Sequence, residues 1–204
     1  MSTELAQKIF GTPNAMALCV LAVLGALVLV AAWSDLRRQR IPNMLVVSGM
    51  LLALLLHGVL PGGYGFLSGV PGGLGFLGSL NGLVFGLFAL LPFYVLRVMG
   101  AGDVKLLAMV GAFVGPSDIW WTLLWTAIAG GALSVVLAVQ RGLLLSVMRN
   151  LRLMFRSLVF TAASSKVEGA DRALVTASPV PYGVAIAVGS IGWGIYRAQL
   201  FGLF

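Results

Sequence analysis

Charge is scarce in this sequence of 204 residues. Only 9% of the residues are Asp, Glu, Lys or Arg, six of them are acidic, and 60% of the chain is apolar. The mean hydropathy of +1.04 excludes a soluble domain of this size, whose surface has to be mostly polar. Apolar runs of about 20 residues, enough to cross a bilayer, take up nearly the whole chain and predict an integral membrane protein without a separate soluble domain.

Cysteine and histidine each occur once, as Cys19 and His57. A single cysteine excludes a disulfide framework and a zinc-binding CxxC pair, and no other ligand cluster is present, so we expect no metal and no cofactor. His57 lies near the end of an uncharged stretch. It could carry a proton, but a lone histidine near a helix end is more often an interfacial residue without a role in function, and we favour that interpretation.

The uncharged runs predict an all-α integral membrane protein, a bundle of six transmembrane helices with an interfacial amphipathic helix. The expected spans are residues 14–33, 43–60, 80–96, 104–116, 119–139 and 181–196, in one domain that covers residues 1–204. The first run is too long for a signal-peptide core and is followed by arginines, so we expect it to be retained. Residues 34–43 read as a polar loop. The glycine-rich stretch 61–78 is either a flexible linker or a loop that re-enters the bilayer, and we favour the linker.

The basic residues indicate the orientation in the membrane. If the loop with Arg37, Arg38 and Arg40 is cytoplasmic, alternation of six spans places eleven of the thirteen Lys and Arg residues on that side and leaves only Lys8 and Arg197 outside. This bias follows the positive-inside rule and predicts an external N-terminus in a bacterial cytoplasmic membrane.

The connection 140–178 is the one long polar segment. Basic and apolar residues alternate in it at helical spacing, which predicts an amphipathic helix on the membrane surface; the two faces are Arg149, Arg152 and Arg156 against Val147, Leu151, Met154 and Leu158. An acidic partner could bind there, but anionic lipid headgroups are the commoner ligand, so membrane lipids are expected partners and nucleic acid is not.

Two aspartates need a functional explanation, because an Asp in the middle of a membrane costs roughly 2.5–3.5 kcal/mol. In the expected topology Asp35 and Asp103 share a depth near the cytoplasmic surface, whereas the other four acids lie on the outer side or in the 140–178 connection. Two close carboxylates in a poorly hydrated site tend to hold one proton between them. That state suits aspartic proteolysis, in which the ionised Asp activates water and the protonated Asp polarises the peptide carbonyl.

Glycines surround the second aspartate in the stretch Gly100-Ala101-Gly102-Asp103. Without side chains at Gly100 and Gly102, an extended substrate backbone could come close to Asp103. In the structural alternative, the glycines only break a helix, Asp103 caps the next helix, and Asp35 pairs with a neighbouring arginine. Spacing alone gives the two interpretations equal weight.

A family resemblance favours the functional interpretation. The GxGD sequence at 100–103 resembles that of intramembrane aspartic proteases, and its occurrence with three further stretches is similar to type IV prepilin peptidases; these are Asp-Leu-Arg-Arg-Gln-Arg-Ile-Pro-Asn at 35–43, Gly-Asp-Val-Lys at 102–105 and Pro-Tyr-Gly-Val-Ala at 181–185. The resemblance implies a six-helix peptidase that removes the basic leader of prepilins or pseudopilins at the cytoplasmic face. Asp35 and Asp103 match the two catalytic aspartates of that family.

The sequence departs from the larger members of this family, and an alternative function is also open. Larger members carry a cysteine-containing domain between the first two spans and methylate the new N-terminus, whereas here only residues 34–41 stand there, which favours the short forms of tight-adherence pilus systems. We expect Lys105, with Gly100 and Gly102, to contribute to substrate binding by orienting the leader or the membrane surface rather than to catalysis. The alternative function is a transporter or pilus-assembly subunit in which Asp35 and Asp103 bind a proton or cation.

Overall fold

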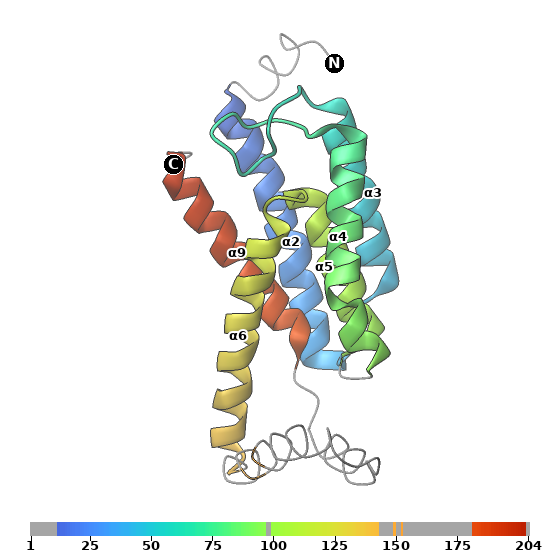
Figure 1. Ribbon diagram of the computed structural model, residues 1–204, viewed down its shortest axis with the longest axis vertical. Helices are drawn as coiled ribbons and strands as arrows, with labels where there is room; N and C mark the ends of the chain where they lie inside the picture. Colours follow the sequence, from blue (N-terminus) through green and yellow to red (C-terminus); the bar gives the residue numbers. More distant parts are fainter. Residues whose placement is uncertain (1–11, 97–98, 143–148, 150–151, 153–180, 203–204) are drawn as a thin grey trace, which may run out of the picture. The chain divides into compact units, whose positions relative to one another are not determined.

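The structure, a computed structural model, describes residues 12–96, 99–142, 149, 152 and 181–202. This part of the chain is helical and contains α2 (Pro13–Arg38), α3 (Asn43–Val59), α4 (Gly75–Val95), α5 (Ala101–Val114), α6 (Ile119–Gln140) and α9 (Tyr182–Leu200) (Figure 1). The all-α prediction is confirmed for these residues. Three of the helices, Asn14–Arg38, Gly75–Val95 and Ile119–Gln140, are long and apolar enough to cross a membrane. The full set of six spans stays a prediction.

The chain divides into two compact units, residues 1–130 with 181–204 and residues 131–180. The first unit holds the helices described below. In the second, the described residues are the last turns of α6, the turn that follows them, and the exposed, helical Arg149 and Arg152. The predicted interfacial helix therefore lies almost wholly outside the described residues.

Helix α5 forms the core of the first unit, since every residue from Leu106 to Val114 is buried. It packs most extensively against α4, where glycines let the two backbones meet. A methyl group added to Gly82 would collide with the Gly111 carbonyl oxygen, and one added to Gly86 would lie 2.6 Å from the Leu107 carbonyl oxygen. Small residues at a helix contact allow this close approach, which suits helices packed inside a bilayer.

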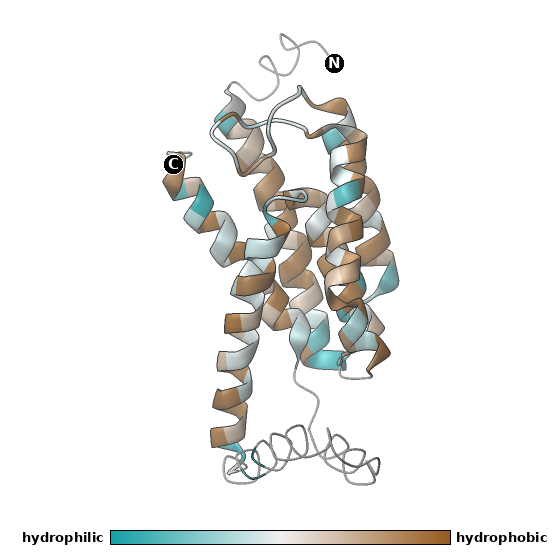
Figure 2. Ribbon diagram, viewed as in Figure 1, coloured by the Kyte–Doolittle hydropathy of each residue, from teal (hydrophilic) through white to brown (hydrophobic). Residues whose placement is uncertain are grey.

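Large apolar side chains remain exposed on the outside of this bundle. Figure 2 shows hydrophobic residues along most of the length of the helices. The exposed ones include Leu29, Leu55, Phe88 and Ile128. In water such a surface would be an aggregation liability, whereas in a bilayer it faces lipid. The apolar exterior of the bundle therefore agrees with the membrane location that the apolar composition predicts.

Helix α9 packs against several other helices of the first unit. It crosses α2 obliquely (Figure 1) and also contacts α5. Its Gly189 lies against the backbone of Thr126 in α6, with a prospective methyl group only 2.5 Å from the Thr126 nitrogen. Helix α9, near the end of the chain, therefore packs beside α2, near its beginning.

The largest differences between the helices and the expected spans lie in α4 and α2. Helix α4 begins at Gly75 rather than at residue 80, and the glycine-rich stretch before it is ordered by two isolated bridges, Gly62 with Gly73 and Gly65 with Gly72. Helix α2 continues to Arg38, five residues beyond the expected span, so residues 34–38 are helical rather than part of a loop. The second correction matters for function, because it places Asp35 in the last turns of a rigid helix.

Candidate active site

Asp35 is held on the final part of α2. The helix ends where Gln39 takes a left-handed conformation with φ 50°, and the Gln39 N–H donates to the Asp35 carbonyl oxygen at 2.8 Å. Asn, Asp and glycine are the usual residues at such a position, and Gln39 is the one described non-glycine residue with positive φ. The Asp35 residue is only 8% exposed. A carboxylate this buried needs a hydrogen-bond donor.

The donor comes from the opposite end of the chain. The backbone N–H of Gly183 donates to Asp35 Oδ2 at 2.9 Å. Gly183 is the second residue of α9, where backbone N–H groups have no partner within the helix and the helix dipole is positive. The start of α9 therefore stabilises negative charge on Asp35.

Asp103 lies in the first turn of α5 and is half-buried. Its Oδ2 accepts a hydrogen bond from the Gly100 N–H at 3.3 Å, and its own N–H donates to the Gly100 carbonyl oxygen at 3.2 Å. One part of the structural alternative is correct only in a modified form, since the N-cap residue is Gly100 and Asp103, the third residue of α5, contributes to the cap by accepting from the Gly100 N–H. The other part is wrong for the described residues, where Asp35 accepts from Gly183 and forms no ion pair with an arginine.

The two aspartates lie within electrostatic reach of each other. Burial at the start of α5 raises the pKa of Asp103 to about 6. The carboxylate of Asp35 adds to the rise in this pKa, while the hydrogen bond from Gly100 opposes it. Burial is thus the larger cause of the raised pKa, and the charge of Asp35 adds to it, as is expected for two carboxylates close together in a poorly hydrated site.

The short connection between α2 and α3 contacts both the end of α2, which carries Asp35, and the start of α5, which carries Asp103. Ser34 Oγ donates to the Arg40 carbonyl oxygen at 2.8 Å, which fastens this connection to the end of α2. At its other end, a methyl group added to Gly102 would lie 3.3 Å from Ile41 Cβ. Gly102 thus lets the connection pack closely on the start of α5, next to Asp103.

The remaining predicted site residues lie at the same end of the first unit. Gly100 is more open than Gly102, since the nearest atom to an added methyl group is Asp103 Oδ2 at 3.4 Å. Exposed Lys105 donates from Nζ to Asn43 Oδ1 at 3.3 Å, so its ammonium is tethered to the first turn of α3. No group of three or more His, Cys, Asp or Glu residues among the described residues could hold a metal ion.

Two contributors were missed as such from the sequence. Gly183 and Asn43 both lie in the stretches that carry the family resemblance, but nothing in the sequence assigns them a contact with Asp35 or Lys105. A backbone donor leaves no side-chain signal, because any residue other than proline has an N–H group. The one feature of Gly183 that the sequence shows is that it is a glycine, and only the structure shows that this leaves room for the Asp35 carboxylate.

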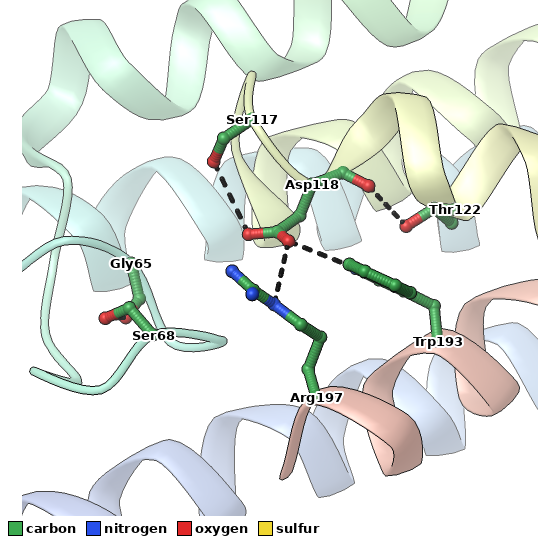
Figure 3. A network of polar contacts seen from close by, with 7 residues as sticks. All are labelled: Gly65, Ser68, Ser117, Asp118, Thr122, Trp193 and Arg197. Atoms are coloured by element: carbon green, nitrogen blue, oxygen red, sulfur yellow. Dashed lines mark hydrogen bonds and ion pairs between the residues drawn. The ribbon is translucent and has the colours of Figure 1, made fainter. Parts of the chain in front are cut away.

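A second buried acid lies apart from this pair. Asp118, which is 3% exposed and precedes α6, accepts hydrogen bonds from Trp193 Nε1 at 3.2 Å and Ser117 Oγ at 3.4 Å. Arg197 Nε lies 3.2 Å from Asp118 Oδ1 (Figure 3). Two partners of Asp118, Trp193 and Arg197, belong to the later turns of α9, whereas Gly183, the partner of Asp35, belongs to the first turn. Asp118 is thus bound in a structural network and is separate from the candidate site.

The fold and the site define a class, a helical protein with membrane-type apolar helices and two neighbouring buried or half-buried aspartates at one end of the bundle. The sequence model of the type IV leader peptidase family matches residues 22–135, which is more than half of the chain. The chain therefore belongs to the type IV leader peptidase family, as the motifs predicted, and it is a peptidase of that general type. Neither the curated proteins nor the solved structures gave a match.

Proposed function

We propose that this protein is an aspartic endopeptidase that removes the leader peptide of type IV prepilins or pseudopilins at the cytoplasmic face of a bacterial membrane. The observation that carries the proposal is the pairing of Asp35 with Asp103, where each carboxylate is held by a backbone N–H and the charge of one acts on the other. Membership in the leader peptidase family supports a peptidase over the transporter or assembly subunit.

The pair can carry out hydrolysis without further groups. An ionised carboxylate takes a proton from water as the water oxygen adds to the scissile carbonyl carbon, and the protonated partner donates its proton to the carbonyl oxygen. The tetrahedral intermediate then collapses as the C–N bond breaks. The leaving amine takes the proton from the first carboxyl group, and the oxygen returns its proton to the second. Both aspartates thereby recover their starting states.

The setting of the pair suits a substrate that comes from the membrane. Asp35 and Asp103 lie where the apolar helices α2 and α5 have their polar ends, and the basic residues Arg37, Arg38 and Arg40 follow at once. With the positive-inside rule, this end is cytoplasmic. Residues 39–42 make up the whole connection between α2 and α3, which supports cleavage without the methylation that larger family members perform.

The experiment is a cleavage assay with purified protein in proteoliposomes and a full-length prepilin of the same bacterium as substrate. We expect the wild type to cut the basic leader from the prepilin, and Asp35→Asn and Asp103→Asn each to lower the rate by at least about a thousandfold, because neither can exchange a proton. Mass spectrometry of the new N-terminus identifies the cleaved bond.

The matched control is Asp118→Asn, which removes a buried carboxylate outside the pair. At a temperature where it stays folded, this variant should cleave at close to the wild-type rate. Normal cleavage by a folded Asp103→Asn variant would overturn the aspartic mechanism. Failure of the folded wild type to process any prepilin or pseudopilin of its own bacterium would overturn the proposed substrate.

A further inference from the structure

The hydrogen bond from Gly183 to Asp35 differs in length and in origin from the one that Asp103 accepts. The hydrogen bond to Asp103 is longer, 3.3 Å, and comes from within the same helical turn. The one to Asp35 is 2.9 Å and links residues 148 positions apart, from the end of α2 to the start of α9. It is also the one hydrogen bond that the Asp35 side chain accepts among the described residues.

Asp35 needs this donor because its other surroundings disfavour its charge. The residue is 8% exposed, so its carboxylate has lost most of its water. It also lies in the last turns of α2, where the helix dipole is negative and repels an anion. The unpaired N–H group and the positive dipole at the start of α9 oppose both effects.

The fit at Gly183 leaves no room for a side chain. A methyl group added there would lie 2.9 Å from Asp35 Oδ2, 3.0 Å from Asp35 Cβ and 3.2 Å from Asp35 Cγ. The same helix offers a contrast, because a methyl group added to Gly194 would meet no atom within 4 Å. Close approach of backbone to carboxylate, rather than helix packing in general, therefore requires glycine at position 183.

We propose that Gly183 is a positioning residue of the peptidase, whose backbone N–H fixes Asp35 in its ionised form as the carboxylate that activates water, which leaves Asp103 as the proton donor. This inference rests on the proposed function. The pKa of about 6 at Asp103, raised by burial and by Asp35, agrees with Asp103 as the partner that holds the proton. Gly183 acts through Asp35 and takes no part in the proton transfers itself.

The first test compares Gly183→Ala with Gly194→Ala in the proteoliposome assay. We expect Gly183→Ala to lower kcat by about ten- to a hundredfold with little change in KM, since a displaced carboxylate affects the chemical step more than substrate binding. Gly194→Ala should keep the wild-type kcat and KM. Equal rates for the two variants would overturn the inference.

A second variant removes the donor without adding bulk. Glycolic acid in place of Gly183, introduced by nonsense suppression, turns the N–H into an ester oxygen and keeps the space unchanged. The loss of a charge-assisted hydrogen bond should lower kcat by about tenfold or more. Because this N–H has no partner within α9, the helix itself should stay intact. This variant decides the question even if Gly183→Ala fails to fold.

The pH profile separates a positioning role from a structural one. A base that loses a donor to its charged form ionises at higher pH, so the acidic limb of the kcat profile should move to higher pH in the ester variant. The neighbouring charged groups are the same in both proteins; they are Arg37 and Arg38 on α2, Arg40 after it, and Asp103 and Lys105 on α5, while the first turn of α9 carries no acidic residue.

The outcomes also distinguish the two proposals. If the wild type cleaves the prepilin and the ester variant matches it within about twofold with an unmoved acidic limb, the role of Gly183 is refuted and the peptidase function stands. If the wild type does not cleave, the proposed function fails before Gly183 is at issue.

Discussion

His57 on α3 and Phe113 on α5 are joined by a hydrogen bond of 2.9 Å between the imidazole Nε2 and the Phe113 carbonyl oxygen. The other ring nitrogen, Nδ1, accepts from the Leu74 N–H at 3.0 Å, so Nε2 carries the proton and the ring is neutral. The imidazole also stacks on Phe66 with ring centroids 4.4 Å apart. His57 is 1% exposed and links the glycine-rich stretch to α3 and α5, so it is a structural residue rather than a bystander, while its depth in the membrane stays a prediction.

Replacement of His57 by alanine should therefore destabilise the protein. The change leaves the buried Phe113 carbonyl and the partly buried Leu74 N–H without a side-chain partner, at about 1–3 kcal/mol for the first and less for the second. The melting temperature in detergent should fall by several degrees, while the cleavage rate per folded molecule stays close to the wild-type value. A His57→Ala protein that melts with the wild type would contradict the role assigned to this ring.

The ion pair of Asp118 and Arg197 supports a second stability prediction. Arg197→Met leaves the Asp118 carboxylate, which is 4% exposed, without its cation. We expect a loss of about 1–3 kcal/mol, below the value for a fully buried pair because the Arg197 side chain is 22% exposed. The double variant Arg197→Met/Asp118→Asn should recover most of this loss, because a neutral Asn can still accept from Trp193 through Oδ1 and can donate from its amide nitrogen to Ser117 Oγ.

The pH dependence of that loss has a definite sign. Burial raises the pKa of Asp118, and Arg197 opposes the rise. Without Arg197 the folded protein favours the protonated acid more strongly, so its stability falls as the pH rises through this pKa. The melting temperature of Arg197→Met should therefore lie further below wild type at pH 8 than at pH 5. An equal difference at both values would show that the charge of Asp118 is not the cause.

The sequence was a good guide to helices where uncharged runs have clear ends. Residues 43–60 and 119–139 were expected, and α3 (Asn43–Val59) and α6 (Ile119–Gln140) have these limits within one residue. At α2 the guide failed, since charged residues were taken as the end of the helix. A helix can continue past the apolar layer, and it ends where the backbone turns, here at Gln39.

The sequence identified the parts of the candidate site that are charged side chains, but not the backbone groups that hold them. Asp35 and Asp103 stand out because carboxylates are costly in an apolar chain, and topology gave them a common depth. The structure brings them within electrostatic reach. The Gly183 donor and the hydrogen bond between His57 and Phe113 depend on contacts between residues far apart in sequence. No local pattern encodes such contacts.

Lys105 should be a supporting residue. Its ammonium is exposed and makes a hydrogen bond of 3.3 Å to Asn43, so it has neither the burial nor the neighbouring carboxylate of the two aspartates. We expect Lys105→Ala to slow prepilin cleavage about two- to tenfold, as for the loss of one ordinary hydrogen bond, and Asn43→Ala to have a similar effect. The assay should rank both variants well above Asp35→Asn and Asp103→Asn. A loss equal to that of Asp103→Asn would place Lys105 in the chemical step.

Asp103 should make the protein less stable at neutral pH than it would be with a neutral side chain there. Its pKa is raised from 3.8 to about 6, chiefly by burial and further by Asp35, so the folded protein binds more protons than the unfolded chain between these values. Stability therefore falls as the pH rises from about 4 through about 6. Asn is neutral at every pH and can still accept the hydrogen bond from Gly100, so Asp103→Asn should be inactive yet melt at a higher temperature than the wild type at pH 7.5. At pH 4 the two melting curves should converge, and a constant difference between pH 4 and pH 7.5 would mean that Asp103 does not titrate in this range.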